Sequence, residues 1–116
     1  EIIKVIQNIN YPEHLDLRSV LRELAQRECN ELHLEAGPKL NGSFLKGGFI
    51  DEWVLYVAPI FMEKGLPLID TNNSILSLFE ASKWSFVETC KFGDDLRIVL
   101  RPSGFNSLYF LHKDSN

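Results

Sequence analysis

Residues 32–52 contain the groups in this chain that are best suited to bind a ligand. A short apolar run ends at the carboxylate of Glu35, and Ala36-Gly37-Pro38 then leads directly into an amphipathic segment. This order predicts a strand, a tight turn and a helix whose N–H groups are directed at the carboxyl end of the strand. Ligands of open α/β sheets bind at that end, and helix N-termini favour phosphate. The turn is therefore a predicted cofactor site, although an ordinary strand–helix connection would have the same spacing.

The residue types in the turn and in the first turn of the helix suit this role. Gly37 lets the backbone turn sharply and lets a ligand approach without meeting a Cβ atom. Pro38 fits the first helical position, because its missing N–H would have no partner there. Lys39 could add a positive charge near a phosphate, but a solvated surface lysine has the same sequence signature. The residues after Leu40 keep this end of the helix small and polar: Asn41, Gly42 and Ser43.

Hydrophobic periodicity predicts the elements that position this turn. Alternating leucines predict a strand over Leu32–Glu35. An N-cap at Asp16 followed by helical spacing predicts a helix with Arg27 near its end and Asn30 just beyond it. The helix after the turn is expected over Pro38–Lys46, because Gly47-Gly48 stops it.

Further segments of the sequence are predicted to be extended. The run over 53–58 is continuously apolar, as expected for a central strand buried on both faces. Trp84–Phe92 and Leu96–Arg101, separated by Gly93-Asp94-Asp95, predict an antiparallel hairpin. Weaker patterns predict a strand over 2–6, a short helix over 74–80 and a strand or packed segment over 108–111.

Length and composition indicate one globular domain over residues 1–116, with a frayed tail at 112–116. Apolar residues make up 45% of the chain and charged residues 24%, which are ordinary values for such a domain. The formal charge of −4 argues against nucleic acid as the main partner. Because the sequence has neither a membrane-spanning run nor a signal-peptide pattern, we expect a cytoplasmic protein without a membrane partner. Cys29 and Cys90 lack metal-ligand spacing, so no metal site is predicted and reduced thiols are expected, with an accidental disulfide as the alternative.

Taken together, these motifs resemble one known family. Glu-Ala-Gly-Pro at 35–38 is followed by Leu-Lys-Gly-Gly at 45–48, by Ile-Asp-Glu at 50–52 and by a strand that ends in Ala58-Pro59. This pattern resembles the reductase domain of the bifunctional riboflavin-biosynthesis deaminase/reductase. The resemblance implies an α/β, dihydrofolate-reductase-like fold: a mixed sheet with flanking helices and a C-terminal antiparallel hairpin. It also implies that this chain holds the C-terminal portion of that domain.

The resemblance further implies the reaction and its site. The family's reaction is the NADPH-dependent reduction of 5-amino-6-(5-phosphoribosylamino)uracil to the ribitylamino form. Glu35 matches the position that contacts this pyrimidine ribose-phosphate substrate. Residues 37–43 match the segment that holds the dinucleotide, through backbone N–H groups, the helix dipole and the side chains of Asn41 and Ser43. No general acid can be named, and His33 is expected to be packed or hydrogen-bonded rather than catalytic.

Other implications of the resemblance concern partners and backbone geometry. The family implies a homodimer and a parent chain fused to a deaminase domain, and the start at Glu1 suggests a fragment. Because dihydrofolate reductases carry a cis Gly-Gly bond here, we hypothesise a cis Ala36–Gly37 bond. The sequence departs from the family at Ile60–Lys64, which puts any dimer contact there in doubt. Two alternatives therefore stay open: an inactive reductase-like interaction or dimerisation module, and a related reductase of another pterin or pyrimidine.

Overall fold

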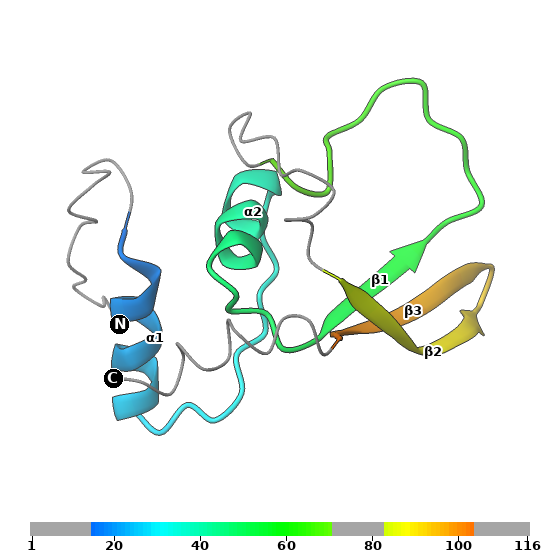
Figure 1. Cartoon of the computed structure of the whole chain (residues 1–116). Helices are drawn as coiled ribbons and strands as arrows, with labels where there is room; N and C mark the ends of the chain where they lie inside the picture. Colours follow the sequence, from blue (N-terminus) through cyan, green and yellow to red (C-terminus); the bar gives the residue numbers. More distant parts are fainter. Residues whose placement is uncertain (1–14, 71–82, 104–116) are drawn as a thin grey trace. The chain divides into compact units, whose positions relative to one another are not determined.

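The structure, a computed structural model, describes residues 15–70 and 83–103, and the chain divides into two compact units, residues 1–35 and 36–116. In chain order the elements are α1 (Leu17–Gln26), α2 (Pro38–Lys46), β1 (Trp53–Val57), β2 (Trp84–Phe92) and β3 (Asp95–Pro102) (Figure 1). The features predicted over 2–6, 74–80, 108–111 and 112–116 lie outside the described residues. The single domain predicted from the length stays a prediction.

Helix α1 begins at the predicted N-cap and ends in a left-handed residue. The carboxylate of Asp16 accepts a hydrogen bond from the backbone N–H of Arg18 at 3.3 Å and another from the Ser19 hydroxyl at 2.6 Å. At the other end, Glu28 has a φ of 61°, and the N–H of Cys29 donates to the Leu24 carbonyl at 3.0 Å. This is a Schellman ending, and it makes Arg27 the C-cap, in agreement with the predicted end near Arg27.

Helix α2 ends in the same motif, built on glycine. Gly48 has a φ of 71°, and the N–H of Phe49 donates to the carbonyl of Phe44 at 3.0 Å. The two phenylalanine rings also meet edge to face, with centroids 6.3 Å apart. The ring contact helps to bury Phe44. Together with the backbone bonds, it sets the direction of the chain after the helix. The predicted stop at Gly47-Gly48 is confirmed.

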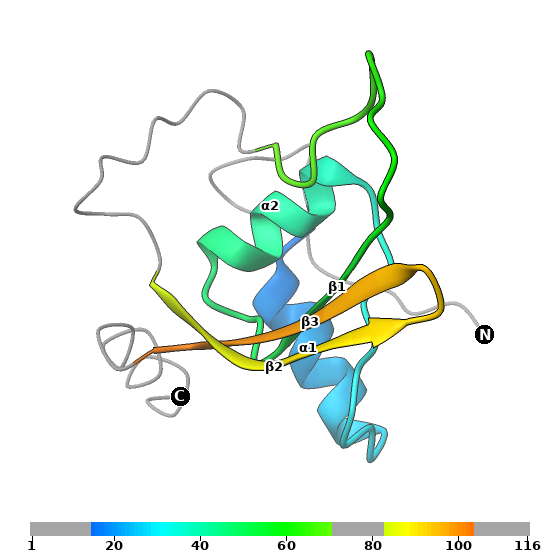
Figure 2. The same cartoon turned by 90° about the vertical axis from the view of Figure 1, so that its right-hand side faces the viewer.

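The described strands form one antiparallel sheet in the order β1-β3-β2, with β3 between the other two strands (Figure 2). The predicted hairpin is confirmed as β2 and β3, but its turn has two residues, because Phe92 already pairs with Asp95. Gly93 takes the first turn position with a φ of 62°, the left-handed value that tight hairpins need. The register shifts once between Phe86 and Glu88, which marks a bulge in β2.

Two strand predictions are wrong, for the same physical reason. Residues 32–35 form no strand, because none of the described strands pairs with them. β1 is the edge of the described sheet rather than a central strand, and its side chains of Val54 and Tyr56 are 38% and 55% exposed. An apolar run indicates that a segment tends to be extended. Whether other strands pair with that segment, and on which side, depends on the tertiary structure.

The hypothesis of a cis Ala36–Gly37 bond is also wrong. The described residues contain no cis peptide bond. A strained peptide persists only where its surroundings impose it. Here the bond follows residues 32–35, which no described strand holds in place.

The end of α1 generates a stability prediction. Replacing Glu28 by glycine should raise the free energy of unfolding by about 1 kcal/mol, because a left-handed conformation costs an L-residue roughly 1–2 kcal/mol and glycine almost nothing. Denaturant unfolding of wild type and variant measures the difference. Glu31→Gly is the matched control, since Glu31 has no positive φ and its replacement should only destabilise. A Glu28→Gly protein less stable than wild type would contradict this ending of α1.

Candidate functional site

The N-terminus of α2 has the geometry of an anion site without a side-chain cap. Gly37 is the N-cap, with extended dihedrals of φ −76° and ψ 177°, and Pro38 occupies the first helical turn. Gly37 makes no side-chain capping bond, because it has no side chain. A Cβ atom added at Gly37 would meet nothing within 4 Å, so the space beside the turn is open.

The backbone donors at this end are consequently few and well defined. The first helical hydrogen bond runs from the N–H of Asn41 to the carbonyl of Gly37, at 3.1 Å. Pro38 has no N–H, so the amides of Lys39 and Leu40 are the donors that the helix itself leaves unused. Both residues are exposed. Two amides and the positive end of the helix dipole thus face accessible space, which favours phosphate oxygens.

The predicted side-chain donors of the site are engaged within the protein. The amide nitrogen of Asn41 donates to the carbonyl of Ala36 at 3.1 Å and to that of Leu68 at 3.2 Å. The hydroxyl of Ser43 donates to the carbonyl of Lys39 at 3.1 Å. Residues 37–43 form the turn and the first part of α2, where both side-chain donors are engaged within the protein, and their role in cofactor binding stays a prediction.

Sequence reasoning missed the segment Leu68–Asp70, which we call the strap. It returns from the long connection after β1 to the start of α2, as can be followed in Figures 1 and 2. The N–H of Asp70 donates to the carbonyl of Pro38 at 2.9 Å. Gly42 is buried beneath the strap. A glycine inside a helix costs about 1 kcal/mol and often marks a close backbone approach, so Gly42 was the available signal.

Glu35 is the last residue of the first compact unit, residues 1–35, and its side chain is exposed. Its side chain is 85% exposed, as is that of His33, whose Nε2 lies 3.7 Å from Glu35 Oε1. An exposed pair at this distance contributes little to stability. The Glu35 carboxylate is consequently accessible to a ligand that offers hydroxyl or amino donors. The sequence predicts a packed or hydrogen-bonded His33; its exposed side chain is not packed, and it makes the contact with Glu35.

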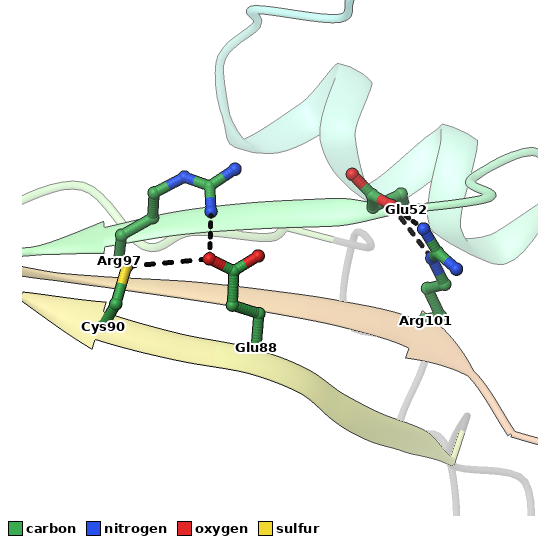
Figure 3. A network of polar contacts seen from close by, with 5 residues as sticks. All are labelled: Glu52, Glu88, Cys90, Arg97 and Arg101. Atoms are coloured by element: carbon green, nitrogen blue, oxygen red, sulfur yellow. Dashed lines mark hydrogen bonds and ion pairs between the residues drawn. The ribbon is translucent and has the colours of Figure 1, made fainter.

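The most connected polar side chains lie away from α2, on the sheet. Arg97 pairs across the strands with Tyr56 on one side and Cys90 on the other. Its guanidinium lies 3.4 Å from Glu88 Oε1, which also accepts from the Cys90 thiol at 3.8 Å (Figure 3). A side-chain hydrogen bond with Tyr56, and secondarily the charge of Glu88, raises the pKa of Arg97 above its usual value. Arg97 is thus a permanent cation in a cross-strand network that organises the sheet.

A second ion pair joins the start of β1 to β3. Both Nε and Nη2 of Arg101 lie 2.9 Å from Glu52 Oε2, and Figure 3 shows the two side chains facing one another. This contact gives Glu52 a structural role between β1 and β3.

Neither metal ligation nor membrane insertion is indicated within residues 15–70 and 83–103. That part of the chain contains no group of three His, Cys, Asp or Glu side chains placed to hold a metal ion. None of its helices is both long and apolar enough to cross a bilayer.

Comparison with known proteins places this geometry in a family. The RibD C-terminal domain family matches residues 1–98. The riboflavin biosynthesis protein RibD of Haemophilus influenzae is 30% identical over 98 residues, covering 84% of this chain and 26% of that protein. The 5-amino-6-(5-phosphoribosylamino)uracil reductase of Buchnera aphidicola subsp. Acyrthosiphon pisum is 31% identical over 94 residues, covering 80% of this chain and 45% of that protein.

A solved structure supports the fold class independently. RibD of Acinetobacter baumannii, form 1, superimposes with a TM-score of 0.67 at 24% identity, covering 77% of this chain and 25% of that one. The predicted dihydrofolate-reductase-like α/β fold is thereby confirmed. The chain spans about a quarter of the length of its RibD relatives, for example 26% of the H. influenzae protein. Since the family match includes the Glu35–Pro38 turn, α1, α2 and β1, this chain belongs to the RibD C-terminal domain family.

Proposed function

We propose that this chain forms the cofactor-binding part of an NADPH-dependent reductase in riboflavin biosynthesis. The substrate of the proposed reaction is 5-amino-6-(5-phosphoribosylamino)uracil, and the product is its ribitylamino form. The observation that carries the proposal is the open, uncapped N-terminus of α2, within the residues that match the family. A relative that is 31% identical bears the name of this reductase.

The residues of the site fit a dinucleotide phosphate. The amides of Lys39 and Leu40 donate to phosphate oxygens, and the missing side chain of Gly37 lets the phosphate come close. The Lys39 side chain adds a positive charge on the same turn. NADPH supplies the hydride when bound, and the protein supplies position and electrostatics.

Substrate contact is proposed for the Glu35 carboxylate. Its exposure leaves both oxygens able to accept hydrogen bonds. Hydroxyl groups of the ribose phosphate and the ring amino group of the substrate are donors of the matching kind. A carboxylate of this sort orients the substrate while the cofactor reacts.

The association of the parent protein is likewise proposed from the family. Fusion to a deaminase domain agrees with relatives named RibD that are about four times as long as the match, whereas homodimer formation is proposed from the family resemblance alone. The proposed geometry of the α2 turn does not depend on the dimer or on the fusion.

The direct test of the proposal is titration of NADPH into the full-length protein that carries this chain. Energy transfer from Trp53 and Trp84 to the dihydronicotinamide reports binding. The reductase proposal expects saturable binding and conversion of the ribosylaminouracil substrate. Absence of binding would instead favour an inactive interaction module, and binding without turnover of this substrate would favour a reductase of another pterin or pyrimidine.

Gly37→Asp should separate helix stability from cofactor affinity. An aspartate N-cap accepts the amides of α2 and favours its dipole, so the free energy of unfolding should rise by about 1 kcal/mol. The same carboxylate competes with the phosphate, so the Kd for NADPH should rise at least about tenfold. Thermal unfolding and fluorescence titration measure the two effects.

The matched control for this variant is Gly65→Asp, which adds the same charge where a new Cβ also meets nothing within 4 Å. Its Kd for NADPH should stay within about twofold of wild type. Equal Kd values for both aspartate variants would contradict the proposal that the cofactor phosphate binds at the α2 turn.

Glu35→Gln tests the substrate role. Loss of the charge should raise the KM for the pyrimidine substrate about tenfold, the effect of one hydrogen bond to a charged group, and leave the Kd for NADPH unchanged. Steady-state kinetics of the full-length protein measure this, with Glu31→Gln as the control in the same exposed segment. An unchanged KM in Glu35→Gln would exclude Glu35 from the substrate site.

A further inference from the structure

The strap holds the first turn of α2 through hydrogen bonds to its backbone. One comes from the N–H of Asp70 to the carbonyl of Pro38, at 2.9 Å. The side-chain amide of Asn41 adds a bridge, because it donates both to the carbonyl of Leu68, at 3.2 Å, and to that of Ala36, at 3.1 Å. The residues just before and just after the Gly37 turn are therefore tied together, and both are tied to the strap.

Gly42 allows this close approach. A Cβ atom built on Gly42 would overlap the carbonyl oxygen of Asp70 and lie 3.3 Å from Cγ2 of Ile69. The overlapping atom belongs to the backbone, so a side chain at Gly42 could be accommodated only by moving the strap. Glycine also weakens an isolated helix by about 1 kcal/mol relative to alanine. The helix thus contains a locally unfavourable residue at the point where the strap lies against it.

From these contacts we propose that the strap sets the affinity for NADPH by fixing the direction of the Lys39 and Leu40 amides, with Asn41 as its positioning residue. This inference rests on the proposed function and goes beyond it. It assigns Asn41 to the carbonyls of Ala36 and Leu68 rather than to the cofactor phosphate. Two donors aimed at one anion are effective only while their directions are held, because hydrogen bonds weaken steeply with misalignment.

The alternative role for Asn41 is a direct bond to the cofactor. The two roles predict different effects of replacing Gly42. If Asn41 contacted the phosphate itself, displacing the strap from Gly42 would leave that bond in place. If Asn41 acts through the strap, removing the amide and displacing the strap damage the same contact. Their effects on affinity would then not add.

The experiment is a double-mutant cycle on the full-length protein that carries this chain. Asn41→Ala, Gly42→Ala and the double variant are each titrated with NADPH and followed by tryptophan energy transfer. Each single variant should raise the Kd about tenfold, and the double variant should stay near tenfold instead of the about hundredfold expected of independent effects. The KM for NADPH should rise with the Kd, while kcat at saturating NADPH should stay near the wild-type value.

Gly65→Ala is the matched control, because it makes the same substitution in the connection before the strap, where a new Cβ meets nothing within 4 Å. Its Kd should equal that of wild type. Circular dichroism and thermal unfolding confirm that each variant is folded, and Asn41→Ala alone still tests the inference if Gly42→Ala does not fold.

The outcomes distinguish this inference from the function on which it rests. Failure of the wild type to bind NADPH overturns both. Normal NADPH binding by wild type together with unchanged Kd values in Asn41→Ala or in a folded Gly42→Ala overturns the role of the strap alone. Additive losses in the double variant overturn the positioning role of Asn41 and make it a direct ligand.

Discussion

The backbone donors at the start of α2 need acceptors that the helix does not provide, and the rest of the site follows from this requirement. Most helices meet it with a serine, threonine, asparagine or aspartate at the N-cap. Here the N-cap is Gly37, which has no side chain to cap the helix, and the next residue is Pro38. A helix that starts in this way gives up some stability and retains a place for an external anion. The strap and Asn41 stabilise the same turn through the carbonyl oxygens of Ala36 and Pro38, and their bonds do not use the N–H groups of the turn.

The two helices show how different residues meet the same backbone constraint. Both end in a Schellman motif, with Glu28 in the left-handed position after α1 and Gly48 after α2. Glycine accepts this conformation without steric cost, whereas glutamate does not. The ending of α2 also buries Phe44 against Phe49, so backbone geometry and apolar packing agree there. That agreement fixes the C-terminal end of α2, opposite to the end where the proposed site lies.

In the sheet, contacts between side chains on neighbouring strands define the register of the strands more than the burial of apolar side chains does. Among the described residues, Phe44 and Val99 are the buried hydrophobic side chains. Trp53 meets Trp84 edge to face with centroids 6.4 Å apart. The Arg97–Glu88 ion pair lies within the β2–β3 hairpin, whereas the Arg101–Glu52 ion pair connects β3 to the distant start of β1. Such pairs fix register, because a slip by one residue would move every partner to the opposite face. The β2–β3 hairpin therefore holds β1 in one defined register, although several side chains of β1 are exposed.

The local features of this protein could be predicted from its sequence. The N-cap at Asp16, the bounds of α2, its glycine stop and the β2–β3 hairpin depend on dihedral preferences and hydrogen bonds within a few residues. All four are confirmed, although the hairpin turn is one residue shorter than predicted. The anion-favouring character of the Gly37 turn is local for the same reason. Tertiary structure decided what depends on distant neighbours: that residues 32–35 form no strand, that β1 lies at an edge, and that Asn41 bonds to a carbonyl 27 positions away. Gly42 belongs to both classes, since its presence in a helix is visible in the sequence but the strap that requires it is not. The physical reason is that periodicity and propensity describe a residue's own conformation, whereas hydrogen-bond partners across the chain exist only once it has folded.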